Sequence, residues 1–130
     1  MKNQLSVFID EVNSFSRRYY SEQLKKLVGK KVKVLIDRPI GYKHEGITYS
    51  LNYGYIENIT ALDGEFQDAY IIDAKEPLNE YVGVVLGIIK REEDIEDKLI
   101  VAKSDIEITD QEIERKVLFV EQYFKHHIEK

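Results

Sequence analysis

Three acidic side chains stand close together near the middle of the sequence. Asp63, Glu65 and Asp68 lie within six residues, and Gly64 allows the chain to turn between the first two. Hard divalent cations prefer oxygen donors of this kind, and magnesium usually binds one or two carboxylates together with waters and phosphate oxygens. The spacing differs from that of an EF-hand calcium loop. The segment is interpreted either as part of a magnesium site or as a solvated acidic hairpin.

A second acidic run covers residues 92–97 and ends at Lys98. Runs of like charge are most often exposed loops, and that is the alternative interpretation here. If this run meets the first cluster, the two sets of carboxylates repel each other unless cations lie between them. We therefore expect metal ions between the two runs if they converge.

Further polar and aromatic residues lie before the first acidic cluster. Asp37-Arg38-Pro39 is followed by Lys43-His44-Glu45, which taken alone is interpreted as ordinary turn polarity with a surface ion pair. Tyr49, Tyr53 and Tyr55 are more typical of a core or barrel wall than of a ligand contact. Their hydroxyl groups can nevertheless donate hydrogen bonds to a phosphate.

Two helices are predicted, one at each end of the chain. Apolar residues recur at three- and four-residue steps over residues 3–27, and Gly29 follows as a stop signal. Ser21 allows the alternative of two shorter helices. The second helix begins after Thr109, which with Glu112 forms a capping-box pattern. His126 and His127 are expected on the surface near the end of this helix.

Five short strands are predicted between the helices. Residues 30–36 alternate in polarity with the two-residue period of a strand. The connections are too short for parallel crossovers, so a small closed barrel is favoured, and Gly83 and Gly87 indicate a bulge or bend. The expected fold is α+β and mainly β, with residues 1–28 as a helical extension and 29–130 as the barrel domain. The other four strands are expected at Tyr53–Thr60, Ala69–Asp73, Val82–Ile89 and Lys98–Ala102.

Composition excludes several classes of protein. A chain of 130 residues suits one domain, and no stretch approaches the roughly 18 apolar residues that span a membrane. The absence of cysteine excludes disulfides and thiolate zinc sites, so a reducing cytoplasm is the expected location. The formal net charge of −5 makes nucleic acid an unfavourable partner and argues against an oligonucleotide-binding module.

Two motifs together resemble the soluble, metal-dependent inorganic pyrophosphatases, which have an oligonucleotide-binding (OB)-type barrel. Tyr49-x-x-Asn52-Tyr53-Gly54-Tyr55-Ile56 is similar to that family's Tyr-Pro-x-Asn-Tyr-Gly-Tyr/Phe-Ile, and Asp63-Gly64-Glu65-x-x-Asp68 to its Asp-Gly-Asp-Pro-x-Asp. The resemblance covers roughly residues 30–125. It implies hydrolysis of pyrophosphate to two orthophosphates by a water activated by Mg²⁺, with Mn²⁺ as an alternative, and a homo-oligomeric assembly.

The resemblance also assigns roles to individual residues. Glu65 matches the carboxylate that orients and deprotonates the attacking water. The implied metal ligands are Asp37, Asp63, Glu65, Asp68, Glu96 and Glu93, with Glu92 and Asp94 as alternatives to Glu93. The implied substrate-binding residues are Lys43, Tyr53, Lys98, Tyr123 and Lys125, the first four of which are also expected to act in catalysis.

The sequence departs from the family pattern at three points. Glu65 replaces an Asp, Ser50 replaces the signature proline, and the arginine that precedes the first motif has no counterpart. Arg38 and Arg91 are the candidates to replace that arginine, and the alternative is that each is an ordinary surface charge. Displacing a catalytic group by about 1 Å costs on the order of 10²-fold in rate. The alternative to a pyrophosphatase is therefore a weak or inactive relative that binds phosphate compounds or nucleotides, or acts on another phosphoanhydride.

Overall fold

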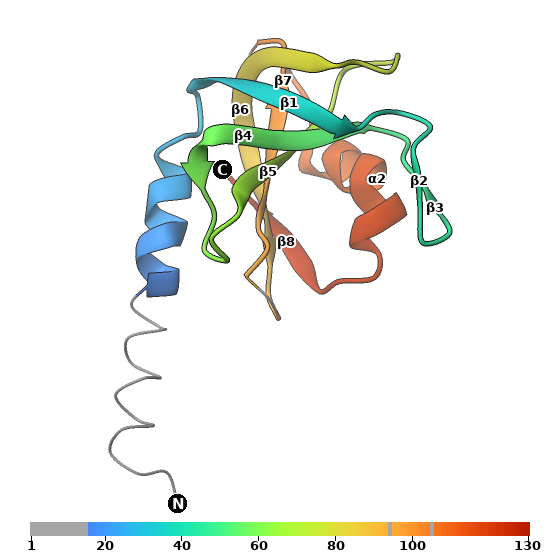
Figure 1. Ribbon diagram of the computed structural model, residues 1–130. Coiled ribbons are helices and arrows are strands. Elements are labelled where there is room, and N and C mark those ends of the chain that lie inside the picture. Colours follow the sequence, from blue (N-terminus) through green and yellow to red (C-terminus); the bar gives the residue numbers. More distant parts are fainter. Residues whose placement is uncertain (1–15, 94, 105) are drawn as a thin grey trace, which may run out of the picture.

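The computed structural model describes residues 16–93, 95–104 and 106–130 (Figure 1). Residues 16–25 form a helix, and the second helix in the described part is α2 (Asp110–Glu121). The strands are β1 (Lys31–Arg38), β2 (Lys43–His44), β3 (Ile47–Thr48), β4 (Asn52–Thr60), β5 (Phe66–Ile71), β6 (Glu80–Arg91), β7 (Lys98–Ala102) and β8 (His126–Glu129).

Five strands close into a barrel, as the sequence predicted. The order is β1-β4-β5-β7-β6, and β6 pairs with β1 to complete the circle. All of these pairs are antiparallel except β5 with β7, which are parallel because the long strand β6 lies between them in the sequence. The OB-type barrel, mainly β with a helix from each end of the chain, is therefore confirmed (Figure 1).

Two elements of the structure differ from the prediction: the strand β8, which contains the two histidines, and the small hairpin β2–β3. His126 and His127 do not lie at the end of a helix, because α2 ends at Glu121 and both histidines belong to β8. Strand β8 pairs with residues 88–91 of β6. The backbone N–H and C=O groups along this edge of β6 would have no hydrogen-bond partners in the sheet if α2 continued as a helix instead. The small hairpin β2–β3 was also missed, since two-residue strands are too short to show a period.

The first helix packs on the barrel of its own chain. Tyr20 and Leu24 lie one turn apart, are both buried, and join a hydrophobic cluster with Val34 and Ile56. A turn over residues 26–29 follows, and Gly29 ends it with φ +87°, a conformation that favours glycine. Of the helix predicted over residues 3–27, the described part contains a single helix over residues 16–25, with no break at Ser21, and residues 1–15 lie outside the described part.

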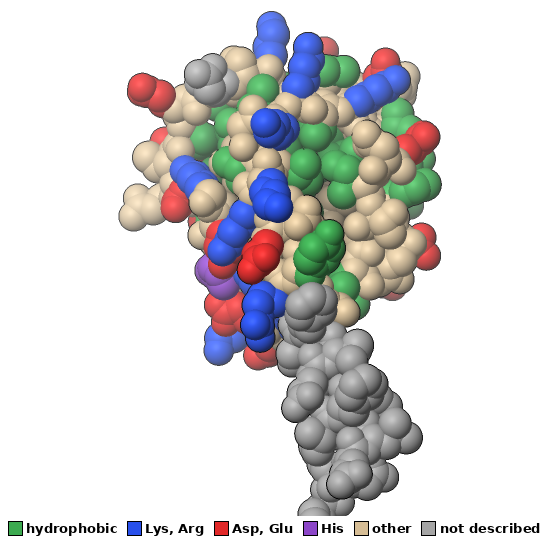
Figure 2. Space-filling model, turned by 90° about the vertical axis from the view of Figure 1, so that its left-hand side faces the viewer, with side chains coloured by type: hydrophobic (Ala, Val, Ile, Leu, Met, Phe, Trp, Pro, Cys, Tyr) green, Lys and Arg blue, Asp and Glu red, His purple; other side chains and the backbone are tan. Residues whose placement is uncertain are grey.

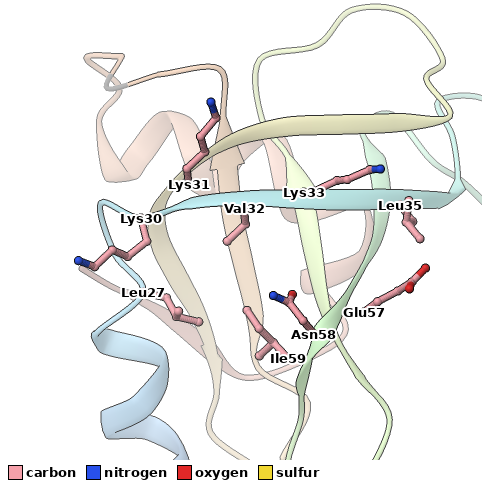
Figure 3. Close-up of a pocket in the computed structure, with 9 residues that line it drawn as sticks. All are labelled: Leu27, Lys30, Lys31, Val32, Lys33, Leu35, Glu57, Asn58 and Ile59. Atoms are coloured by element: carbon pink, nitrogen blue, oxygen red, sulfur yellow. The ribbon is translucent and has the colours of Figure 1, made fainter.

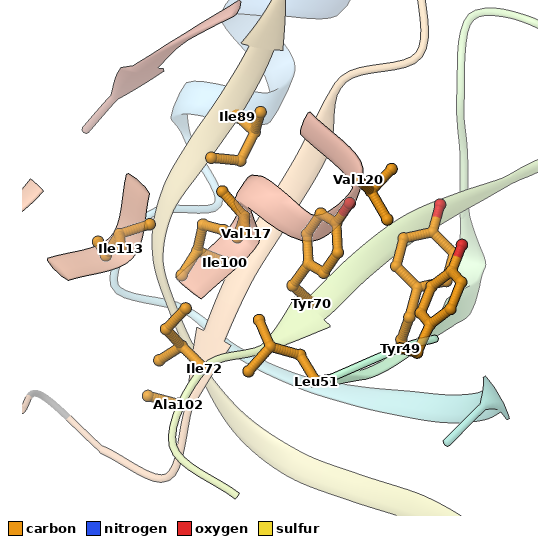
Figure 4. Close-up of a cluster of buried hydrophobic side chains, with 11 residues drawn as sticks. Tyr49, Leu51, Tyr70, Ile72, Ile89, Ile100, Ala102, Ile113, Val117 and Val120 are labelled. Atoms are coloured by element: carbon orange, nitrogen blue, oxygen red, sulfur yellow. The ribbon is translucent and has the colours of Figure 1, made fainter. Parts of the chain in front are cut away.

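A second hydrophobic cluster joins the barrel to α2. Ile113, Val117 and Val120 recur at helical spacing and face Tyr70 and Ile100 of the barrel (Figure 4). The helix begins at the predicted cap, where the Thr109 hydroxyl accepts a hydrogen bond from the Glu112 N–H. Helix α2 is consequently fixed over one end of the barrel.

The close spacing of neighbouring strands depends on glycine at Gly54 and at Gly83. A Cβ atom added to Gly54 would lie 1.9 Å from the carbonyl oxygen of Leu35 on the neighbouring strand. The bulge expected near Gly83 and Gly87 is present, since the register between β6 and β7 shifts between Val85 and Gly87. Among the described residues, no helix is long and apolar enough to cross a membrane.

Candidate functional site

A cavity of about 320 Å³ lies between the barrel and α2. Both motifs and the second acidic run contribute residues to it. Its lining combines three cations, three carboxylates, a histidine, three tyrosines and three apolar side chains: Arg38, Arg91, Lys98, Glu45, Asp68, Glu96, His44, Tyr49, Tyr53, Tyr70, Ile47, Val120 and Phe124.

Asp68 is the centre of the first charged group in the cavity. The Lys98 Nζ donates to Asp68 Oδ2 at 2.9 Å, and the Tyr53 hydroxyl donates to the same oxygen at 2.5 Å. Strand register explains this meeting, because β5 lies between β4 and β7, which carry the two donors. Burial and the Asp68 charge raise the pKa of Tyr53 well above its ordinary value, so its hydroxyl stays protonated and can donate.

Arg91 is the centre of the second group. Its Nε and Nη2 donate to the two carboxylate oxygens of Glu121 at 3.1 and 2.8 Å, and its Nη1 donates to Glu96 at 3.2 Å. The guanidinium carbon also lies 3.7 Å from the centre of the Phe124 ring. Glu121 is completely buried and accepts a further hydrogen bond from Tyr70 at 2.7 Å. Arg91 is therefore held by contacts on three sides.

Arg38 contributes a third cation through different contacts. Its Nη1 donates to the Tyr49 hydroxyl at 2.5 Å, and its guanidinium lies 5.4 and 5.7 Å from the ring centres of Tyr49 and Tyr53. Within the part of the chain that the structure describes, Arg38 forms no ion pair at 4.0 Å or less. Burial raises the pKa of the adjacent Asp37, and the charge of Asp68 adds to this.

The structure brings together some of the residues that the sequence singled out. Tyr53, Asp68, Glu96 and Lys98 all line the cavity, and both arginines considered as substitutes, Arg38 and Arg91, do so as well. One residue of each acidic stretch, Asp68 and Glu96, therefore lies in this cavity. The roles implied for them by the resemblance remain predictions.

Other predicted site residues do not line the cavity. Asp63 and Glu65 are exposed at the turn between β4 and β5, where Asp63 Oδ1 accepts a hydrogen bond from the Glu65 N–H. Tyr123 is 64% exposed, and Phe124 is in the lining instead. The remaining residues outside the lining are Asp37, Lys43, Glu93 and Lys125, the last of which lies 3.7 Å from Glu92.

A metal ion needs several oxygen ligands that are not already bonded to cations of the protein. Asp68 is already bonded to Lys98 and Tyr53, and Glu96 is bonded to Arg91. In residues 16–93, 95–104 and 106–130, no group of three or more histidine, aspartate or glutamate side chains is arranged to hold a metal ion. The described side chains thus do not fit the multi-carboxylate centre that the resemblance implies.

The sequence interpretation missed Glu121, which is bonded to Arg91 of the cavity lining, and Tyr70, which lines the cavity. Glu121 had a signal in the sequence. It continues the apolar stripe of α2, four residues after Val117, and is as buried as its apolar neighbours. A glutamate at a core position of a helix needs a charged or hydrogen-bonding partner inside the protein. The position of Glu121 on the apolar stripe could therefore have predicted a buried glutamate, although it does not identify Arg91 as the partner.

A larger cavity, of about 480 Å³, lies on the outside of the barrel (Figure 3). It opens where β1 diverges from β4, which pair only from Leu35 onward. Its side chains are mainly apolar residues and lysines, with Glu57 as its one carboxylate. Figure 2 shows basic side chains over the face above the N-terminal helix, among hydrophobic atoms. This cavity lacks a converging set of acids, bases and hydroxyl groups, so the cavity beneath α2 is the candidate site.

The closed barrel and the helix that covers its charged end form a pyrophosphatase-like fold, as the comparison with solved structures shows. Neither a known family profile nor a curated protein matches the sequence. Among solved structures, inorganic pyrophosphatases from Ehrlichia chaffeensis and Coxiella burnetii both superpose with a TM-score of 0.64, at 14% and 17% identity. The alignments cover 79% of this chain in both cases, and 87% and 88% of those chains.

The pyrophosphatase of Helicobacter pylori is similar to the same extent. Its TM-score is 0.63 at 15% identity, over 77% of this chain and 84% of that one. The resemblance predicted from the two motifs is therefore confirmed at the level of the fold. Identities this low mean that the shared barrel, rather than a shared set of side chains, carries the likeness.

Proposed function

We propose that this protein binds pyrophosphate, or a related anion with linked phosphate groups, in the cavity beneath α2. The observation that carries the proposal is the presence of Arg38, Arg91 and Lys98 in one cavity of about 320 Å³. Guanidinium groups match the geometry of phosphate oxygens and donate two hydrogen bonds at once, while lysine acts as a point charge.

Arg38 is the first contact for an incoming anion. It lines the cavity without a carboxylate partner among the described residues, so binding a phosphate oxygen does not require an ion pair to break. Tyr49 and Tyr53 add hydroxyl groups to the same wall. Lys98 lies deeper and exchanges part of its contact with Asp68 for a contact with the ligand.

Binding calorimetry with sodium pyrophosphate tests this proposal. Arg38→Gln is expected to weaken binding by at least about tenfold, because a charge-assisted hydrogen bond is lost. Arg115→Gln is the matched control, since Arg115 is an exposed arginine on α2 away from the cavity. Absence of binding, or equal affinities of the Arg38 variant and the unchanged protein, would contradict the proposal.

Hydrolysis of pyrophosphate to two orthophosphates with magnesium or manganese is a second candidate function. The presence of Tyr53, Asp68 and Lys98 in one cavity supports it, because all three occupy positions that the resemblance assigns to the reaction. Phosphate release from pyrophosphate, triphosphate and nucleoside diphosphates is the measurement. Release that stops with EDTA and falls strongly in Asp68→Asn supports hydrolysis, and no release at micromolar protein argues for binding alone.

The assembly and location stay predictions. The resemblance leads us to expect a homo-oligomer, and the lack of cysteine leads us to expect the cytoplasm. Light scattering of the full chain measures the number of subunits directly.

A further inference from the structure

The carboxylates of the candidate site already have cations of the protein beside them. Asp68 is paired with Lys98 at 2.9 Å, and Glu96 is paired with Arg91 at 3.2 Å. A divalent ion placed between these two acids would lie next to both cations and would be repelled by them. The arrangement therefore differs from an acidic cluster that needs a metal to relieve its repulsion.

Arg91 cannot easily move away from this position. Its guanidinium is bonded to both oxygens of Glu121 and packs on the Phe124 ring. Glu121 is itself fully buried on a helix whose neighbouring residues Val117 and Val120 lie in the core. The positive charge is thus fixed at the wall of the cavity, as an ion-binding site would fix a metal.

We infer that Arg91, held by Glu121, takes the place of a divalent cation in this site, so that pyrophosphate binds without added metal. The inference rests on the proposed function and states which charge recognises the ligand. It goes against the metal dependence that the sequence resemblance implies.

Glu96 has a particular role in this arrangement. It is bonded to Arg91 from a loop, and its side chain is 50% exposed, whereas Glu121 on the other side is buried. An anion entering the cavity therefore competes with Glu96, rather than with Glu121, for the guanidinium. Removing the Glu96 charge makes anion binding stronger, whereas removing a metal ligand would make it weaker.

The experiment is calorimetric titration of the full chain with sodium pyrophosphate, once in EDTA and once with magnesium. We expect binding in EDTA, and about fivefold tighter binding by Glu96→Gln, as for loss of a partly exposed competing carboxylate. Glu107→Gln is the matched control, because it removes one exposed glutamate outside the cavity and should leave the affinity unchanged. Arg91→Lys keeps the charge but loses the two-point contact and the ring packing, and should bind about tenfold more weakly.

The outcomes separate the inference from the proposed function. Binding that requires magnesium, or an unchanged or weaker affinity of Glu96→Gln in EDTA, would overturn the role of Arg91 while leaving pyrophosphate binding in place. No binding in either buffer would overturn the proposed function and the inference with it. If Arg91→Lys unfolds, as a thermal melt would reveal, the affinity of Glu96→Gln for pyrophosphate in EDTA alone tests the inference.

Discussion

The carboxylate of Glu121, on α2, accepts hydrogen bonds from two nitrogen atoms of Arg91, at the end of β6, over 3.1 and 2.8 Å. Both side chains are almost completely enclosed, and Tyr70 of β5 donates to the same carboxylate. Ile113 and Val117 of the same helix pack on the barrel through apolar contacts, which are less directional than these hydrogen bonds. This ion pair therefore fixes how the helix sits above the cavity.

Glu121→Gln is expected to destabilise the protein by about 3 kcal/mol, because breaking a buried pair leaves the charge of Arg91 without its main partner. Urea unfolding measures the free energy difference. Glu107→Gln, at an exposed position, serves as the control and should change stability by less than about 0.5 kcal/mol. Equal stabilities of the two variants would show that the pair does not anchor α2.

Leu24→Ala should cost about 3 kcal/mol if the first helix is part of the folded barrel, since a buried leucine loses its contacts and leaves a cavity. Leu118→Ala removes the same side chain from an exposed position of α2 and should cost less than about 1 kcal/mol. The shift in thermal unfolding of both variants provides the comparison. A small effect at Leu24 would mean that the helix is not needed to stabilise the barrel.

Gly54→Ala is expected to destabilise the barrel by at least about 3 kcal/mol, because the added Cβ would lie 1.9 Å from a backbone oxygen of the next strand. Gly87→Ala should be milder, since its Cβ would lie 3.0 Å from the Glu129 oxygen on the edge strand β8. Circular dichroism and chemical unfolding distinguish the two. Wild-type stability of the Gly54 variant would be inconsistent with the close approach of β1 and β4.

The stability of the protein should fall as the pH rises through the raised pKa of His127, one of the two histidines of β8. The protonated His127 ring donates hydrogen bonds to Glu129 and Glu92, each over 2.9 Å, and these contacts raise the pKa of His127 above its ordinary value. For a histidine whose pKa is higher in the folded state, the stabilisation is complete below the pKa of the unfolded chain. It is lost as the pH rises through the raised value.

His127→Gln should remove this part of the pH dependence, with an effect of at most about 1 kcal/mol because the side chain is half exposed. Thermal unfolding between about pH 6 and pH 8 is the measurement. His44→Gln, in the β2–β3 hairpin, is the control for loss of a histidine elsewhere. A steeper fall of stability in the His127 variant than in the unchanged protein would reverse the expected sign.

Local patterns were enough to predict most of the secondary structure. The two-residue alternation around Val32 and Val34 and the capping residue Thr109 act between near neighbours, so they are visible in the sequence. Strand β8 was not predicted, because its formation depends on the free edge of β6 rather than on its own residues. The same is true of the short strands β2 and β3.

The sequence by itself determined a small barrel with a helix from each end, and it indicated that Asp68, Glu96 and Lys98 belong to one site. Only the tertiary structure decided which charges neutralise each other there. Asp68 with Lys98 and Arg91 with Glu121 are each 30 residues apart, and their meeting depends on strand register and on the docking of α2. Ion pairing acts between groups that are a few ångströms apart in space, so the spacing of residues along the chain does not predict which charges pair.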